Sequence, residues 1–359
     1  MVTIKEALTF DDVLMLPRYS NILPTDTNIN LSLTNKINLK VPFLSSAMDT
    51  VTESNMAIAM GKAGGIGIIH RNLKIKKQAN EIKKVKRKNI LVGAAIGTNK
   101  EDLERARSLL DNGVDLIVID TAHGHSAKVL NILSKLKKIN KRISICVGNI
   151  ATGEAAKELY NCGADIIKVG IGPGSICTTR MVAGIGVPQI SAILEVKRAL
   201  NKKKIKIISD GGIKFSGDIA KALAAGADAI MMGSIFAGTD ESPGKKFKIR
   251  GKFYKVYRGM GSIGAMSSGS ASRYFQKNYK DKSKFVPEGV EGRVEYKGGL
   301  SKIIYQLQGG LRSSMGYIGA KNLGEIKKKA KFIKITKAGF YESMVHSVEM
   351  TQKTINYKF

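Results

Sequence analysis

The sequence contains no tryptophan, only seven prolines and only three cysteines among its 359 residues. So few prolines exclude a proline-rich linker protein, and three cysteines without a Cys-x-x-Cys pair do not form a disulfide framework. No apolar run approaches the roughly 20 residues that a membrane span needs, and no apolar segment follows Met1 as in a signal peptide. We therefore expect a cytoplasmic protein of a reducing compartment, without a membrane partner.

Acidic residues are also scarce, because 29 Asp and Glu stand against 59 Lys and Arg, which gives a formal net charge of +30. Such a surplus concentrates anions at the surface, whether nucleotides, nucleic acid or acidic lipid. However, we find no basic stripe interleaved with aromatic residues and no helix-turn-helix or RNA-recognition signature. We interpret the charge as solvated helix faces and predict no specific nucleic-acid partner. Nonspecific nucleic-acid binding by the basic surface is the non-enzymatic alternative.

What the sequence does contain is a regular alternation of short apolar runs and helical stretches. Hydrophobic residues make up 43% of the chain and glycines number 38. The apolar runs are short and rich in β-branched residues, as expected for parallel strands that are buried on both faces. Eight strands are predicted, at Pro42–Ala47, Gly65–His70, Leu91–Ile96, Asp115–Asp120, Ile143–Gly148, Ile166–Gly170, Ile205–Asp210 and Ala229–Gly233.

The segments between these strands read as helices with a common ending. Helices are predicted at Thr98–Asn112, Thr152–Asn161 and Ser216–Ala225, and each leads into a glycine at 113, 163 or 226. Glycine adopts the left-handed conformation at little steric cost, so the chain can turn back into a sheet. Eight strands alternating with helices predict a (β/α)8 TIM barrel rather than an open doubly wound sheet.

A barrel of this kind places its active site at the carboxyl ends of its strands. Asp210–Ile213 follows the seventh strand and Gly233–Ser234 follows the eighth, and glycine lets the backbone approach an anion. We therefore predict a phosphate cradle there. Two long connections, Ile171–Gln189 and Phe236–Gly299, are typical of lids or binding loops.

Cys177 is the best candidate nucleophile. It lies on the Gly-rich loop Gly170–Arg180 after the sixth strand, where backbone N–H groups and Arg180 could favour the thiolate. Cys146, within a strand, and Cys162, at a helix end, read as structural.

Two other motifs are interpreted differently from their usual meaning. Gly259–Gly264 matches G-x-G-x-x-G but lacks a βαβ setting, so its glycines are expected to let the main chain approach a flat base. His123 and His125 are not assigned to a metal because no third ligand is spaced nearby. Asp120, at the end of the fourth strand, is the better candidate to bind a ribose or a ring.

Several longer motifs resemble the inosine-5′-monophosphate (IMP) dehydrogenase family along nearly the whole chain. These are Glu6–Val13, Ser45–Glu53, Gly170–Arg180, Ser209–Ile213, Tyr257–Ser262, Ser272–Gln276 and Pro287–Arg293. The resemblance implies NAD-dependent oxidation of IMP to xanthosine monophosphate (XMP) by a homotetramer. Cys177 would attack C2 of the hypoxanthine ring, and hydride transfer to NAD would leave a covalent thioimidate.

The resemblance also implies how the thioimidate is hydrolysed. Once the reduced cofactor has left, a mobile flap with Ser272–Gln276 would close into its place. Arg273 would then activate water, with Tyr274 supporting it and Thr179 assisting. From its residue type alone, Arg273 reads as a phosphate ligand, because the free pKa of arginine is above 12.

Binding roles follow from the resemblance position by position. The substrate would contact Met48, Ser175, Asp210, Gly211, Gly212, Gly233, Ser234, Tyr257, Arg258, Gly259, Met260, Gly261 and Glu288. NAD would contact Asp120, Thr121, Ala122, Gly170, Ile171 and Gly172. A K⁺ site would use the carbonyls of Gly172, Gly174 and Cys177, completed by Glu342, Ser343 and Met344 of a neighbouring subunit.

The chain departs from the family at one place. The family usually carries a pair of cystathionine-β-synthase-type (CBS) regulatory modules after the second helix, whereas Val85–Leu91 runs straight through, so the pair is absent at about 86–91. We expect one catalytic domain over 1–359 with a flap and finger region at about 236–299. Guanosine monophosphate (GMP) reductase, which normally lacks the CBS pair, is the alternative, but Arg273–Gln276 and Arg258–Ser262 favour the dehydrogenase.

Overall fold

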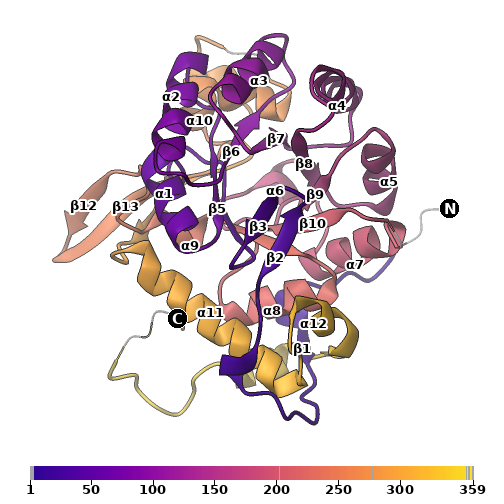
Figure 1. Cartoon of the computed structure of the whole chain (residues 1–359). Helices are drawn as coiled ribbons and strands as arrows, with labels where there is room; N and C mark the ends of the chain where they lie inside the picture. The colour runs from indigo at the N-terminus through magenta and orange to yellow at the C-terminus, as the bar shows by residue number, and fades with distance from the viewer. Residues whose placement is uncertain (1–3, 202, 277–278, 353, 355, 358–359) are drawn as a thin grey trace.

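The computed structural model describes residues 4–201, 203–276, 279–352, 354, 356 and 357. Its centre is a closed barrel of eight parallel strands, in the order β4, β5, β6, β7, β8, β9, β10 and β11 (Figure 1). The strands are β4 (Phe43–Ser45), β5 (Ile66–Ile69), β6 (Val92–Ile96), β7 (Leu116–Asp120), β8 (Ser144–Ile150), β9 (Ile166–Val169), β10 (Lys206–Asp210) and β11 (Ala229–Met232). The predicted (β/α)8 fold is confirmed, and only β8 runs beyond its predicted range.

Helices surround the barrel as the alternation predicts (Figure 1). They are α1 (Ser54–Lys62), α2 (Ile75–Lys86), α3 (Glu101–Asp111), α4 (Ala127–Ile139), α5 (Gly153–Asn161), α7 (Gln189–Ala199), α8 (Ser216–Ala225) and α11 (Leu300–Ile318). The predicted start of α3 at Thr98 is wrong by three residues. The Asp102 carboxylate accepts the backbone N–H groups of Gly97 and Asn99, and these bonds hold the preceding residues in a turn.

The glycines that follow the helices have the conformation that the sequence predicts. The φ angles of Gly113, Gly163 and Gly226 are +83°, +100° and +125°. A side chain would be strained at such angles, so these positions let α3, α5 and α8 turn directly into the next strand.

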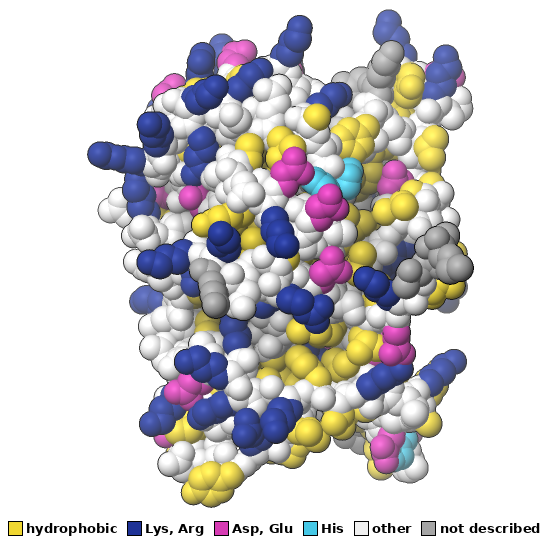
Figure 2. Space-filling model, turned by 90° about the vertical axis from the view of Figure 1, so that its right-hand side faces the viewer, with side chains coloured by type: hydrophobic (Ala, Val, Ile, Leu, Met, Phe, Trp, Pro, Cys, Tyr) yellow, Lys and Arg dark blue, Asp and Glu magenta, His cyan; other side chains and the backbone are white. Residues whose placement is uncertain are grey.

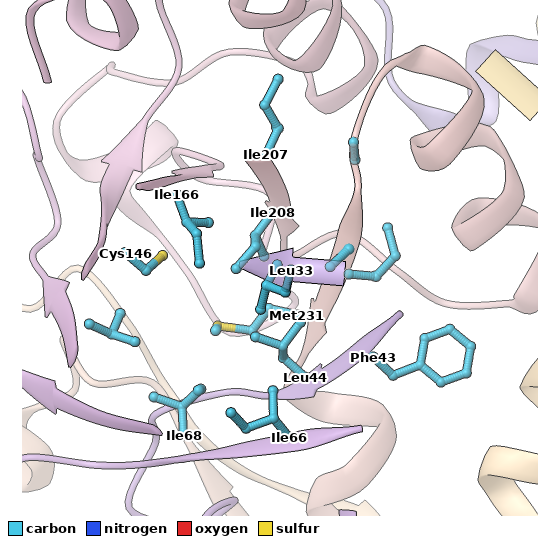
Figure 3. Packing of buried hydrophobic residues seen from close by; sticks show 14 of the residues in the cluster. Leu33, Phe43, Leu44, Ile66, Ile68, Cys146, Ile166, Ile207, Ile208 and Met231 are labelled. Carbon is cyan, nitrogen blue, oxygen red and sulfur yellow. The ribbon is translucent and has the colours of Figure 1, made fainter. Parts of the chain in front are cut away.

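The interior of the barrel is apolar and is closed at one end by a hairpin. Strands β2 (Leu31–Thr34) and β3 (Ile37–Leu39) pair with each other in front of the barrel in Figure 1. Leu33 of this hairpin lies among Leu44, Ile208 and Met231 of the barrel strands (Figure 3). Because Leu33 is 1% exposed, its burial contributes about 1.5–3 kcal/mol to stability.

A small antiparallel sheet and a long loop lie between β11 and α11. After α9 (Ser234–Ala237), strands β12 (Lys246–Ile249), β13 (Lys252–Arg258) and β14 (Glu291–Glu295) form what we call the finger sheet, which extends to one side of the barrel (Figure 1). Residues 259–290, which we call the flap segment, join β13 to β14 and include α10 (Ile263–Ala265). Residues 277 and 278 of this segment lie outside the described residues.

The remaining elements complete the chain. A short helix α6 (Thr179–Val182) interrupts the connection between β9 and α7, and α12 (Leu323–Lys329) and α13 (Lys337–Glu342) follow α11. Strand β15 (Phe332–Lys334) pairs with β1 (Val13–Met15). Only residues 87–91 connect α2 to β6, which is where the family insertion would enter. No helix in the described part of the chain is long and apolar enough to cross a bilayer.

Candidate active site

A cavity lies at the carboxyl ends of the barrel strands, where the fold predicts the site. Its walls come from residues after β4, β7, β9, β10 and β11 and from the flap segment. Segments that are far apart in the sequence therefore meet around one space, as a TIM barrel allows.

Most of the predicted site residues line this cavity. They are Met48, Asp120, Ala122, Gly170, Ile171, Gly172, Gly174, Ser175, Cys177, Thr179, Asp210, Gly211, Gly212, Gly233, Ser234, Tyr257, Gly259, Met260, Arg273, Tyr274 and Glu288. Thr121, Arg258, Gly261 and the segment Glu342–Met344 are not among the lining residues. Thr121 bonds to the Gly148 carbonyl, and Arg258 forms an ion pair with Asp49 at 2.7 Å, so both side chains support the wall from behind.

The loop that carries Cys177 is fixed to the flap segment by backbone hydrogen bonds. Thr178 N donates to Glu288 O at 3.0 Å, and Val290 N donates to Ile176 O at 3.0 Å. The Cys177 thiol donates to the hydroxyl of Thr179 at 3.3 Å. The thiol thus faces the cavity from a wall that both loops build.

The other two cysteines and Arg180 have structural contacts. Burial raises the pKa of Cys146 to about 12, so this thiol stays protonated and unreactive at neutral pH. Arg180 donates to the Val187 carbonyl at 2.7 Å and packs against Gly172, which anchors the loop. The influence of Arg180 on the Cys177 thiolate remains a prediction.

The predicted phosphate cradle consists of glycines and hydroxyl groups. Gly211 and Gly212 have φ angles of +91° and +82°, and a side chain at 212 would crowd Phe10 and Pro173. The Tyr257 hydroxyl bonds to Ser175, and burial raises the pKa of Tyr257, so its hydroxyl stays neutral. An anion placed here would meet neutral donors and backbone N–H groups rather than lysines.

Lys168 is a buried cation of the cavity wall that the sequence interpretation missed. It lies in β9 with 1% of its surface exposed. Its ammonium donates to the carboxylates of Asp120 at 2.9 Å and Asp210 at 2.7 Å, and to the amide oxygen of Asn149. Lys168 thus joins the residue predicted for the cofactor side to the residue predicted for the substrate ribose.

The flap segment inserts Arg273 into the same network. The Arg273 guanidinium forms an ion pair with Asp120. The backbone carbonyl of Arg273 accepts the N–H of Ala122 at 3.1 Å. Burial lowers the pKa of Arg273, Tyr274 opposes this change, and the positive charge of Arg71 lowers it further. Tyr274 lies over Gly261, where a side chain would come within 2.7 Å of its ring.

Comparison with known proteins decides the family. A model described as the IMP dehydrogenase / GMP reductase domain matches residues 7–346. The chain belongs to this family. An inosine-5′-monophosphate dehydrogenase of Cryptosporidium parvum is 49% identical over 399 aligned residues, covering 99% of this chain and 98% of the relative. Proteins of the same name from Borreliella burgdorferi and Aquifex aeolicus are 47% and 42% identical and cover 96% and 99% of this chain, and 98% of each relative.

The alignment lengths bear on the missing insertion. The Aquifex aeolicus alignment spans 483 positions, although this chain has 359 residues, so that relative contains residues without a counterpart here. Because α2 and β6 are joined by residues 87–91 alone, the chain matches a form of the family without the CBS pair.

The part of the chain that the structure describes contains no cluster of side chains suited to a transition metal. Among the described residues, no group of three or more His, Cys, Asp or Glu is placed to hold a metal ion. His125 pairs with Glu158 at 2.5 Å, and His70 pairs with Glu53 at 3.3 Å. A hard monovalent cation would need the loop carbonyls instead, and that predicted site stays a prediction.

Lys168 and Arg71 differ in how the sequence could have identified them. A lysine inside the otherwise apolar run Ile166–Val169 is a signal, because buried lysines are nearly always paired. Arg71 follows β5 without any motif, and only the folded chain brings it to the flap segment.

Proposed function

We propose that this chain catalyses the NAD-dependent oxidation of IMP to XMP, a step of guanine nucleotide biosynthesis. The observation that carries the proposal is that Cys177 lines the same cavity as the neutral donor cradle and the Arg273–Tyr274 pair. The named relatives at 42–49% identity support the same activity.

In the first half of the reaction, Cys177 forms a bond to C2 of the purine ring. The Ser175, Gly212 and Gly233 region would hold the phosphate, and Asp210 would bind the ribose hydroxyls. NAD, when bound, would supply the hydride acceptor for C2, and the thiol proton would be released to solvent, so that Cys177 would carry the oxidised purine as a thioimidate. Thr179, whose hydroxyl accepts from the thiol at 3.3 Å, is placed to orient the nucleophile.

The residues on the far side of the cavity fit the cofactor by their charge. Asp120 and Asp210 carry two negative charges against one positive charge on Lys168, and Arg273 adds the second positive charge in this structure. When the part of the flap segment that carries Arg273 leaves, Asp120 can balance another cation besides Lys168, and the nicotinamide of oxidised NAD carries a positive charge. Asp120, Ala122 and the Gly170–Gly172 backbone would hold it.

In the second half of the reaction, the flap segment supplies the base. Water adds to C2, its proton passes to Arg273, and the C2–S bond breaks with its electron pair returning to Cys177. The base must be a neutral guanidine. Burial lowers the pKa of Arg273 in the required direction, whereas its ion pair with Asp120 favours the charged form. Arg273 occupies the Asp120 side of the cavity, which supports hydrolysis after the reduced cofactor has left.

The family resemblance further supports a homotetramer in the cytoplasm with K⁺ held by loop carbonyls. Glu342, Ser343 and Met344 lie at and after the end of α13, outside the cavity. In this proposal they reach the Gly172–Cys177 loop of another subunit, which makes each cation site depend on assembly.

One assay tests the proposed function against its alternative, GMP reductase activity. With IMP, NAD and K⁺, absorbance of NADH should rise, and XMP should form in equal amount. With GMP and NADPH, no oxidation of NADPH is expected. The reverse pattern would assign the chain to the reductase side of the family.

Substitution of the nucleophile tests the mechanism. Cys177→Ser should bind IMP but form no covalent adduct in a mass spectrum, because a serine hydroxyl is far less ionised than a thiol. Cys146→Ser is the matched control and should retain the adduct, because Cys146 is buried in β8. Substantial turnover by Cys177→Ser would show that another group is the nucleophile.

A further inference from the structure

Arg71 connects a barrel strand to the flap segment. It follows β5 and His70, and its Nη1 donates a hydrogen bond to the Ser272 hydroxyl at 3.1 Å. Ser272 immediately precedes Arg273, the proposed base. Arg71 therefore contacts the flap one residue from the group that enters the cavity, although it is not itself a lining residue.

The Arg71 guanidinium also packs against the barrel. A side chain at Gly97 would come within 2.7 Å of both Arg71 Nη1 and Asp102 Oδ2, so the guanidinium fits beside the bare backbone after β6. Burial lowers the pKa of Arg71, and the charges of Asp102 and Glu101 oppose this shift. The barrel thus supplies packing space and nearby negative charge for the Arg71 guanidinium.

The residue after Arg71 contacts the flap segment at a second point. The Asn72 side-chain amide donates to the Asp49 carboxylate at 2.8 Å and to the Ala265 carbonyl at 3.5 Å. Arg71 and Asn72 therefore bind two points of the stretch 265–272 from one loop after β5. The longer contact at Ala265 is weak by distance, which leaves the Arg71–Ser272 bond as the stronger tie.

We propose that Arg71 is a positioning residue that secures the flap segment in the cavity and makes Arg273 effective in the hydrolytic step. The inference rests on the proposed function and deepens it. Because the contact exists only when the flap segment is seated, Arg71 should serve hydrolysis of the thioimidate and not its formation.

Arg71 has a second effect through its charge. A like charge nearby disfavours protonation, so Arg71 lowers the pKa of Arg273, whereas Tyr274 and the paired Asp120 carboxylate favour the protonated form in all variants. If the Arg71 charge is removed, the pKa of Arg273 rises and less neutral guanidine is present at a given pH. In the pH profile of the hydrolysis rate, the ascending part should then move to higher pH.

Three variants separate the hydrogen bond from the charge. Arg71→Gln removes the charge, Arg71→Lys keeps it with altered geometry, and Ser272→Ala removes the acceptor but keeps the charge. Lys76→Gln, on the exposed side of α2, is the control for loss of one positive charge. For each variant, NADH formation is followed in the first turnover and at steady state, and trapped thioimidate is measured by mass spectrometry.

For Arg71→Gln, we expect first-turnover hydride transfer within about twofold of the native rate and a steady-state rate about tenfold lower. A bond to a charged donor has this magnitude. The thioimidate should accumulate, and the ascending part of the pH profile of hydrolysis should move to higher pH. Arg71→Lys should recover part of the rate, and Ser272→Ala should lower it without the shift in pH. Lys76→Gln should behave as the native protein.

Two results would overturn the proposal. Native steady-state turnover in Arg71→Gln would show that the contact does not position the flap segment. Equal losses of hydride transfer and turnover, without thioimidate accumulation, would show that Arg71 only supports the fold. If the native protein forms no NADH and no thioimidate from IMP and NAD, the proposed function itself fails and this inference fails with it.

Discussion

At the scale of single residues, the site depends on a balance of buried charges. Lys168 bonds to Asp120 and Asp210, so one ammonium separates two carboxylates that would otherwise repel each other. Burying a charge is unfavourable unless it is paired, and removal of one partner leaves the others uncompensated. Lys168 therefore sets the relative positions of Asp120 and Asp210 in the cavity wall.

Lys168→Met tests this balance. We expect the free energy of unfolding to fall by about 3–5 kcal/mol, because two carboxylates remain without their common cation. Urea denaturation measures the loss, and Lys157→Met on the exposed side of α5 is the control. Adding Asp210→Asn to Lys168→Met should restore part of the stability, because the only ion pair of Asp210 among the described residues is with Lys168, whereas Asp120 keeps its ion pair with Arg273. No recovery in the double variant would contradict the role in charge balance.

The sequence predicted residues whose conformation or chemistry is local. Gly113, Gly163 and Gly226 were predicted because a helix must end before a strand begins. Lys168 left a signal in its own strand, although its two partners lie on β7 and at the end of β10. Arg71 left none, because Ser272 is 201 residues away along the chain.

At the scale of elements, the flap segment is the part of the chain on which the two halves of the proposed reaction differ. It is docked by backbone and side-chain bonds to the ends of three barrel strands, through Ala122, Asn72 and the Cys177 loop. Each contact is small, so the flap segment is docked on the barrel and is not part of its core.

Arg273→Ala should separate the two chemical steps. Hydride transfer should be changed by less than about threefold, while hydrolysis falls by about 10²–10⁴, the range for loss of a general base. Rapid-quench measurement of the thioimidate and of XMP gives both rates. Lys280→Ala, an exposed position of the same segment, should leave both rates unchanged. An equal loss in both steps would exclude the role in water activation.

The elements of the barrel could be predicted from the sequence, whereas the finger sheet could not. Barrel strands are short apolar runs, and their pattern survives without knowledge of neighbours. Strand β12 alternates exposed and half-buried residues, whereas β13 begins with two exposed residues and then alternates half-buried and buried ones. The two strands are joined by Arg250 and Gly251 with φ angles of +45° and +79°. Such a turn usually contains Asn-Gly, and an arginine at its first position gives no recognisable signal.

At the scale of the whole molecule, the net charge of +30 is not concentrated in the site. Figure 2 shows Lys and Arg side chains spread over the visible face, with Asp and Glu between them. In the cavity, Lys168 and Arg273 are both paired with carboxylates. The finger sheet does combine cations with aromatic rings, since Lys246 lies 3.5 Å above Tyr296 and 4.7 Å above Phe253.

The surface charge predicts weak binding to polyanions without sequence preference. Affinity for two single-stranded oligonucleotides of different sequence should be equal and should fall at least tenfold between 50 and 200 mM salt, because binding releases counterions. Fluorescence anisotropy measures both. IMP should not displace the oligonucleotide, because the cradle has no free lysine. A preference for one sequence that persists at high salt would contradict the interpretation of the charge as a solvated surface.

In the proposed mechanism, the ion pair between Arg273 and Asp120 makes the flap segment an internal competitor for the dinucleotide. Any ligand that needs Asp120 binds only the fraction of molecules in which the segment is displaced, so its apparent dissociation constant equals the intrinsic one divided by that fraction. Ligand affinity at this site therefore depends on the equilibrium between the docked and displaced flap segment as well as on the contacts that the ligand makes. A substitution far from the ligand that weakens docking of the segment should tighten ligand binding by the factor by which it increases the displaced fraction.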